Sequence, residues 1–193
     1  MLDQGFFDRY PEQLIHFNSS PYTYRALKQQ SQQIAAFLID QALSGVRLGI
    51  VMGRNQQCFS TIFAALSVGC PVLLLDPSYP SSRIQQMLDL AKIDILLSDE
   101  ETSVEGLGSF KNIVLSSSVI EKFSPLSGQI QTNPSQAAFI YFTSGTTLIP
   151  KAVEISHEFL HQYLSALQKK IPLTPLDKCC HSASFSFVSS LRF

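Results

Sequence analysis

Residues 48–77 read LGIVMGRNQQCFSTIFAALSVGCPVLLLDP, and this stretch decides the fold. Two short apolar runs, at 48–52 and 71–75, flank a helical pattern over 59–68. Neither run alternates apolar with polar residues, which is typical of strands that helices cover on both faces of a sheet. The order of strand, helix and strand therefore predicts a parallel pair within an α/β domain.

The flanking residues continue this alternation in both directions. The other predicted elements are helices over 23–45 and 80–91 and strands at 93–97 and 113–115. Residues 98–134 contain several glycines and prolines and are interpreted as a loop-rich connection around one strand. These patterns predict a single α/β domain over residues 1–193, with an open, mainly parallel, doubly wound sheet flanked by helices.

The helix over 23–45 has a defined start and a predicted buried stripe. Thr23 belongs to the residue types that cap helix N-termini, and Gly45 is placed to close the segment. The stripe predicted to face the core consists of Leu27, Ile34, Ala35, Leu38 and Ile39.

Composition excludes several classes of function. The 193 residues are 45% hydrophobic and only 15% charged, and 14 Lys and Arg against 15 Asp and Glu give a net charge of −1. This balance offers no electrostatic footprint for nucleic acid or for an anionic membrane, so neither is an expected partner. The four cysteines show no paired spacing and predict neither a metal site nor a disulfide framework. With no signal-like or membrane-spanning run, the sequence favours a reducing cytoplasm.

The residues most informative about chemistry are 137–151, which read AAFIYFTSGTTLIPK. An apolar strand ends in small and hydroxyl-bearing residues, followed by a proline and a lysine. Such a loop exposes backbone N–H groups and hydroxyls beside one positive charge, which suits a di- or triphosphate. The candidate phosphate-binding residues are Thr143, Ser144, Gly145, Thr146, Thr147 and Lys151. The alternative is a turn with solvated hydroxyls, and the glycine pattern of a Walker A loop is absent.

This segment resembles the phosphate-binding signature of the adenylate-forming (AMP-binding) superfamily, which runs Thr-Ser-Gly-Thr-Thr-Gly-x-Pro-Lys-Gly. Three further segments, 23–27, 66–83 and 184–187, are similar to motifs of the same family and occur in the same order. The Leu-Asp-Pro-Ser-Tyr-Pro stretch within the second of them is most similar to the adenylation domains of nonribosomal peptide synthetases.

The resemblance implies a function as well as a fold. Members of this family use ATP and Mg²⁺ to convert a carboxylic acid into an acyl-adenylate, and a thiol such as phosphopantetheine on a carrier domain then takes the acyl group. The chain would be the N-terminal part of the large body of such an acid–thiol ligase. Because no segment before Phe193 matches the family's adenine, ribose or C-terminal lid motifs, we expect the chain alone to be inactive and assign no catalytic residue. The alternative is a noncatalytic remnant or subunit that works through protein association.

Three departures from the family pattern bear on binding. Leu148 and Ala152 stand where the family has glycines, and leucine does not readily adopt a positive φ or allow close backbone approach. This departure argues against tight nucleotide binding. In the predicted acid pocket, Phe187 is followed by Val188, where amino-acid-activating members carry an aspartate that pairs with the substrate ammonium. Because valine cannot neutralise that charge, the predicted substrate is a keto, hydroxy, aryl or aliphatic acid without an α-amino group.

Other residues have structural explanations. His157 follows Ser156 at a predicted helix start, and Asp76 is explained by an Asp-Pro turn. The adjacent Cys179 and Cys180 are interpreted as core thiols. A dinucleotide-binding fold is not favoured, because no Gly-x-Gly-x-x-Gly follows a predicted strand. Self-association is predicted from the apolar residues Phe185, Phe187, Val188, Leu191 and Phe193.

Overall fold

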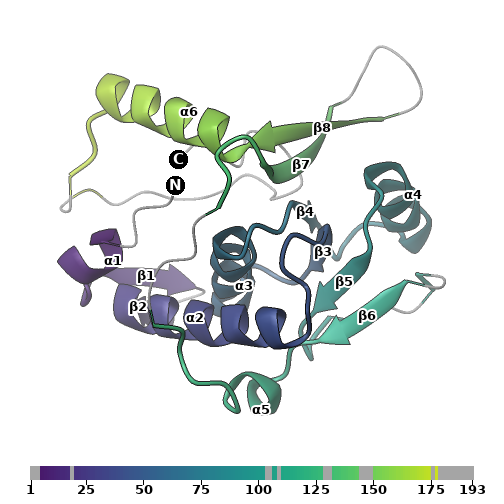
Figure 1. Ribbon diagram of the computed structural model, residues 1–193, viewed down its shortest axis with the longest axis horizontal. Coiled ribbons are helices and arrows are strands. Elements are labelled where there is room, and N and C mark those ends of the chain that lie inside the picture. The colour runs from purple at the N-terminus through teal and green to yellow at the C-terminus, as the bar shows by residue number, and fades with distance from the viewer. Residues whose placement is uncertain are drawn as a thin grey trace.

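The computed structural model describes residues 5–17, 20–102, 106–107, 110–127, 132–143, 150–174 and 177. The helices are α1 (Gly5–Arg9), α2 (Tyr24–Asp40), α3 (Gln56–Ser67), α4 (Ser81–Ala91), α5 (Ser117–Ile120) and α6 (His157–Lys170). The strands are β1 (Leu14–Phe17), β2 (Ser20–Thr23), β3 (Leu48–Val51), β4 (Val72–Leu75), β5 (Ile95–Ser98), β6 (Lys111–Val114), β7 (Ala137–Thr143) and β8 (Lys151–Ser156). Figure 1 shows how these elements are arranged.

A six-stranded sheet forms the centre of the fold, in the order β6-β5-β3-β4-β7-β8. All neighbouring strands in it are parallel except β7 and β8, which form an antiparallel hairpin at one edge. The prediction of a mainly parallel sheet is confirmed, and the antiparallel edge strand makes the sheet mixed. β1 and β2 pair separately as a small antiparallel hairpin.

Both faces of the sheet are covered by helices, which explains the apolar strand sequences. Val72 and Leu74 of β4 belong to a core shared with α2 and α3, whereas Leu73 and Leu75 belong to a second core shared with α4. Figure 1 shows α2 and α3 together on one side of the central strands and α4 on the other. The doubly wound arrangement predicted from the apolar runs is therefore confirmed.

Side-chain caps set the starts of the two helices that flank β3. The Thr23 hydroxyl accepts a hydrogen bond from the Ala26 N–H at 3.1 Å and begins α2, as predicted. Asn55 Oδ1 accepts from the Cys58 N–H at 2.9 Å, so α3 begins before the predicted Phe59. Each cap satisfies an N–H group that has no partner within the first helical turn.

α2 differs from its prediction at its end and in its buried stripe. It ends at Asp40, and Gly45 lies beyond it in a turn with a φ of +77°. Ile39, predicted to face the core, is 42% exposed. Phe37 is buried instead and packs edge-to-face against Phe123, with ring centroids 5.5 Å apart. The stripe is shifted because an aromatic partner from a distant segment covers Phe37.

The connection predicted to be loop-rich contains a short helix as well as the strand β6. α5 begins at the Ser116 cap and, among its residues, buries Ile120. Elements this short have little stability alone, so their formation depends on tertiary contacts, here with α2. The same reason explains why the local sequence did not predict α1, β1 and β2.

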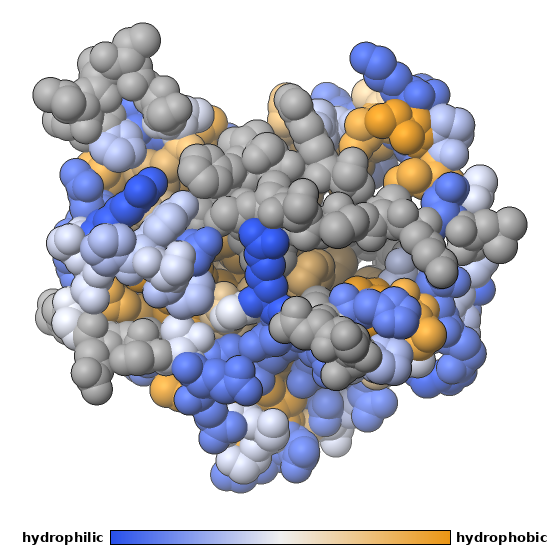
Figure 2. All heavy atoms as spheres, turned by 180° about the vertical axis from the view of Figure 1, so that it is seen from behind, coloured by the Kyte–Doolittle hydropathy of each residue, from blue (hydrophilic) through white to orange (hydrophobic). Residues whose placement is uncertain are grey.

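Hydrophobic side chains reach the surface at separate places. Figure 2 shows orange residues interspersed with hydrophilic ones on the face that it presents. Phe159 on α6 and Ile171 just after it are more than half exposed. Among the described helices, none combines the length and the apolar character needed to cross a membrane.

Candidate functional site

The hairpin of β7 and β8 carries the segment that the sequence predicts to bind phosphate. β7 is buried along most of its length and emerges at its end, where Phe142 is half-buried and Thr143 is exposed. Thr143, the last residue of β7, is paired in register with Lys151, the first residue of β8. The Lys151 side chain is also exposed. The structure thus brings these two predicted residues together where the connecting loop begins and ends.

The remaining predicted site residues lie outside the described part of the chain. They are Ser144, Gly145, Thr146 and Thr147 of the loop, and Phe187 and Val188 of the acid pocket. Leu148 also lies outside it. Ala152, however, is described and pairs with Phe142 within the strand ladder. Because Ala152 has the extended backbone of a strand, which any residue adopts, its replacement of a family glycine introduces no backbone strain.

The end of β7 lies at the same edge of the sheet as several polar residues. The carboxyl ends of parallel strands meet at one edge, and here these are the ends of β3, β4, β5, β6 and β7. Asp76 follows β4, and its Oδ1 accepts hydrogen bonds from the N–H and the hydroxyl of Ser78 at 3.0 and 2.7 Å. This geometry supports the interpretation of Asp76 as a turn residue.

Asn55 and Asp99, which the sequence analysis did not single out, meet at this edge. Asn55 Nδ2 donates a hydrogen bond to Asp99 Oδ2 at 2.8 Å. Asp99 is 4% exposed, and its Oδ1 has no hydrogen-bond partner within the described ranges. The chain leaves β3 toward β4 and leaves β5 toward β6, in opposite directions, so the pair occupies the topological switch point of the sheet. No local pattern could have revealed this contact, because the two residues are 44 positions apart.

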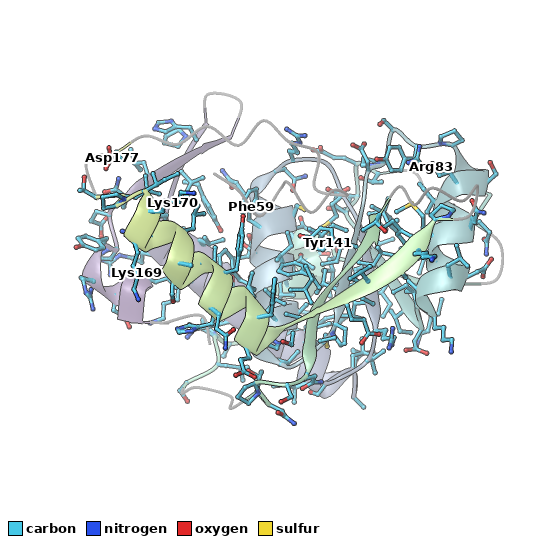
Figure 3. All side chains as sticks on the ribbon, turned by 90° about the horizontal axis from the view of Figure 1, so that it is seen from above. Phe59, Arg83, Tyr141, Lys169, Lys170 and Asp177 are labelled. Carbon is cyan, nitrogen blue, oxygen red and sulfur yellow. The ribbon has the colours of Figure 1, made fainter. Side chains whose placement is uncertain are left out.

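The basic residue Arg83 and the pair Lys169 and Lys170 lie on different sides of the molecule. Arg83 in the first turn of α4 lies over the ring of Tyr79, 4.2 Å from its centroid, in a cation–π contact. Figure 3 shows Lys169 and Lys170 at the far end of α6, on the opposite side of the molecule from Arg83. Lys151 is the first residue of β8, and α6 begins after the other end of that strand, so these two lysines do not add to the positive charge of Lys151.

The described cysteines are buried thiols. Burial raises the pKa of Cys58 to about 12, with a further contribution from Asp99, and raises the pKa of Cys70 to about 11. Thiols with such values stay protonated at neutral pH, so neither is an activated nucleophile. Cys179 and Cys180, predicted to be core thiols, lie outside the described residues.

His157 occupies a structural position at the start of α6. The Ser156 hydroxyl accepts a hydrogen bond from the Phe159 N–H at 3.1 Å and caps the helix. The backbone N–H of His157 donates to the Gln136 carbonyl oxygen at 3.0 Å. Its side chain is buried, and burial lowers its pKa. A neutral imidazole packed at a helix start agrees with the structural role predicted for this residue.

The described ends of the hairpin, Thr143 and Lys151, carry side-chain hydrogen-bond donors. Within the part of the chain that the structure describes, no three His, Cys, Asp or Glu side chains form a group that could hold a metal ion. Thr143 and Lys151 offer a hydroxyl and an ammonium group, both of which donate hydrogen bonds to phosphate oxygens. Mg²⁺ that accompanies a nucleotide takes phosphate oxygens and waters as ligands with only one or two carboxylates, so it does not require such a group.

Comparison with protein families identifies the chain. The family model described as AMP-binding enzyme matches residues 6–193. The chain therefore belongs to the AMP-binding enzyme family, and the resemblance seen in its motifs is confirmed.

Similar proteins include large synthetases of bacteria and fungi. The chain is 29% identical to a plipastatin synthase of Bacillus subtilis (strain 168), over 97% of its own length and 8% of that protein. It is also 29% identical to nonribosomal peptide synthetase SIDC of Beauveria bassiana (strain ARSEF 2860), over 78% of its own length and 3% of that protein. The chain thus spans less than a tenth of either relative.

Solved structures share this fold. The N-terminal subdomain of Klebsiella oxytoca NpsA is 26% identical with a TM-score of 0.81, and the match covers 97% of this chain and 49% of that one. The nonribosomal peptide synthetase FmoA3, in its alpha-methyl-L-serine-AMP bound form, is 21% identical with a TM-score of 0.84, over 97% of this chain and 21% of that one. The architecture is therefore that of the N-terminal subdomain of adenylate-forming enzymes.

Proposed function

We propose that this chain carries the triphosphate-binding hairpin of an ATP-dependent carboxylate-activating enzyme. The observation that carries the proposal is the register pairing of Thr143 with Lys151 at the two ends of a hydroxyl-rich loop, in a chain of the AMP-binding enzyme family. The family match favours this function over a noncatalytic remnant that acts through association.

The proposed reaction has two steps. A carboxylate oxygen attacks the α-phosphorus of ATP, which forms an acyl-adenylate and releases pyrophosphate. A thiol, such as the phosphopantetheine of a carrier domain, then attacks the acyl carbon, and AMP leaves. Catalysis of such steps depends on positioning the reactants and on stabilising the charge that develops on the phosphate oxygens.

In this proposal the hairpin loop binds the phosphates that leave as pyrophosphate. Backbone N–H groups of the loop donate hydrogen bonds to them, and Gly145 allows close approach of the backbone. The donating hydroxyls belong to Thr143, Ser144, Thr146 and Thr147. Lys151 supplies the positive charge, and Mg²⁺ accompanies the nucleotide, held mainly by phosphate oxygens and water.

The proposed acid lacks an α-amino group. Phe187 and Val188 would line part of its pocket, and an apolar side chain at Val188 cannot neutralise an ammonium ion. The NpsA subdomain, 26% identical to this chain, was solved with 3-hydroxybenzoyl-AMSN and with 3-hydroxyanthranilyl-AMSN. These complexes support aryl acids as the first class to test.

The reaction is proposed for the protein in which this segment acts within a larger body. Residues 1–193 would form one α/β domain, which corresponds to 49% of the NpsA subdomain. The C-terminal lid of the family would complete the site. Cys58 and Cys70 are free thiols, which supports a reducing, cytoplasmic setting.

Nucleotide titration of the chain tests the phosphate site. Lys151→Met removes the proposed phosphate contact, and Lys122→Met, at an exposed position after α5, removes the same charge elsewhere. We expect Lys151→Met to weaken the binding of ATP and of pyrophosphate about ten-fold, equivalent to about 1.4 kcal/mol, and Lys122→Met to leave both unchanged. Equal affinities in the two variants would contradict the proposal.

Exchange and binding assays test the reaction and the acid class. We expect the chain alone to show no acid-dependent pyrophosphate exchange with a panel of carboxylic acids, and clear exchange would contradict this. For the acid class, matched acyl-sulfamoyl adenosines with and without an α-amino group are titrated against the larger protein for which the reaction is proposed. Wild type should prefer the analogue without the amine, and Val188→Asp should reduce that preference. A ten-fold preference of wild type for the amino analogue would contradict the assignment of Val188.

A further inference from the structure

Strand β8, which begins with Lys151, has few buried contacts of its own. Its first four residues are exposed, and Ile155 is its one buried residue. It pairs with β7 along one side and is the last strand of the described sheet. An edge strand with little apolar burial opens more readily than a central strand. A contact beyond the β7 ladder would therefore help to hold Lys151 in a defined place.

Arg47, just before β3, provides such a contact. Its Nη2 forms an ion pair with Oε1 of Glu154 in β8, 107 positions later in the chain. Its Nη1 donates to the carbonyl oxygen of Ala91, the last residue of α4, at 3.1 Å. Its backbone N–H donates to Asp94 Oδ2 at 3.3 Å. Arg47 therefore joins the start of β3, the end of α4 and the exposed strand β8.

The sheet register explains why these groups meet. One row across β3, β4, β7 and β8 consists of Gly49, Leu73, Ile140 and Glu154. Arg47 lies two positions before Gly49, and residues two apart in a strand share a face. This is the face that α4 covers, as Leu73 and Ile140 pack in the α4 core. The long arginine side chain thus bridges the end of α4 and the edge strand on one face of the sheet.

We propose that Arg47 and Glu154 are positioning residues that hold β8 so that Lys151 is directed at the phosphates. The inference rests on the proposed function of the hairpin. Glu154 lies three residues after Lys151 on the same strand, and Arg47 acts through Glu154. A guanidinium suits this role because its planar set of donors serves the Glu154 carboxylate and the Ala91 carbonyl together.

The pair acts on local orientation more than on global stability. The Arg47 side chain is 34% exposed and that of Glu154 is 49% exposed. Ion pairs at such exposure are screened by solvent and contribute little to the free energy of unfolding. Opening of β8 should therefore respond to loss of the pair, whereas global unfolding should hardly change.

Amide hydrogen exchange of the full chain tests the contact. Glu154→Gln removes the charge at nearly constant size, and Glu121→Gln, at an exposed site just after α5, is the matched control. The β8 amides that pair with β7 should exchange about three-fold faster or more in Glu154→Gln, and at the wild-type rate in Glu121→Gln. Arg47→Met should speed the exchange of the β8 amides in the same way. In the double variant these amides should exchange no faster than in either single variant. Wild-type exchange in Glu154→Gln would overturn the proposal.

ATP titration of the same variants separates this inference from the proposed function. Glu154→Gln should weaken ATP binding about two- to five-fold without a change in the free energy of unfolding. Faster exchange with unchanged ATP affinity would overturn the positioning role. If Lys151→Met binds ATP as wild type does, the proposed function fails and the positioning role fails with it. The exchange result alone then decides whether Arg47 restrains β8.

Discussion

The Asn55 side chain forms a hydrogen bond to Asp99 and also caps the start of α3. Its Nδ2 donates to Asp99 Oδ2 at 2.8 Å, and its Oδ1 accepts from the Cys58 N–H at the start of α3. Open α/β sheets commonly bind ligands at their topological switch point, whereas here an internal hydrogen bond occupies that point. The candidate phosphate site lies elsewhere on the same edge, at the hairpin of Thr143 and Lys151.

Asn55→Ala should destabilise the protein by more than the loss of a helix cap. A lost cap costs about 1 kcal/mol, and a buried carboxylate deprived of its donor adds about 1–3 kcal/mol. Urea denaturation should therefore show a free energy of unfolding lower by about 2–4 kcal/mol. Thr23→Ala is the control, because Thr23 caps α2 without holding a buried charge, and it should lose about 1 kcal/mol. Equal losses in the free energy of unfolding for Asn55→Ala and Thr23→Ala would show that the hydrogen bond from Asn55 to Asp99 does not stabilise the fold.

Gly49→Val should disturb the packing of α4 on the sheet. A Cβ at Gly49 would lie 2.9 Å from Leu88 Cδ2 and 3.0 Å from Leu96 Cδ1, which leaves no room for a branched side chain. We expect a loss of about 1–3 kcal/mol in the free energy of unfolding. Gly53→Val is the control, because its added Cβ would be 3.9 Å from the nearest atom, Asn55 Nδ2. Identical thermal midpoints for the two variants would refute this explanation.

His157 should make the stability of the protein sensitive to acid. Burial lowers its pKa below the usual value of about 6.5. As the pH falls from about 6.5 toward the folded-state pKa, the unfolded chain binds a proton on this side chain that the folded chain does not, so stability is lost.

His157→Gln should reduce this loss when free energies of unfolding are compared at about pH 7.5 and pH 5.5. A wild-type pH dependence in His157→Gln would count against the role of the buried imidazole.

The chain should self-associate at high micromolar concentration. The apolar residues of 185–193 that predicted this lie outside the described part. On α6, Phe159 is 53% exposed and its ring stacks on Tyr163 with centroids 6.4 Å apart, which presents aromatic surface to solvent. Phe159→Ser should lower the mass measured by light scattering, and Leu14→Ser, at an exposed position on β1, should not. A monomeric wild type would contradict the prediction.

Much of the fold was predictable because its determinants are local. The runs at 48–52 and 71–75 predicted buried strands, and β3 and β4 are strands whose residues are all buried. Thr23 predicted the start of α2, because a cap acts on an N–H only three residues away. The loop motif likewise predicted Thr143 and Lys151 as neighbours of one site, since a hairpin joins residues that are close in the chain.

Contacts between distant residues were decided by the tertiary structure. Phe37 replaced Ile39 in the core because Phe123 packs against it. Asn55 with Asp99, and Arg47 with Glu154, are 44 and 107 positions apart, so no helical or strand period encodes either pair.

The sequence by itself thus determined the buried strands β3 and β4, the capped start of α2 and the phosphate-loop motif, because these depend on neighbouring residues. Only the tertiary structure decided which side chain donates to Oδ2 of the buried Asp99 and which side chain pairs with Glu154 of β8. The physical reason is that the order and register of the sheet bring these distant segments together.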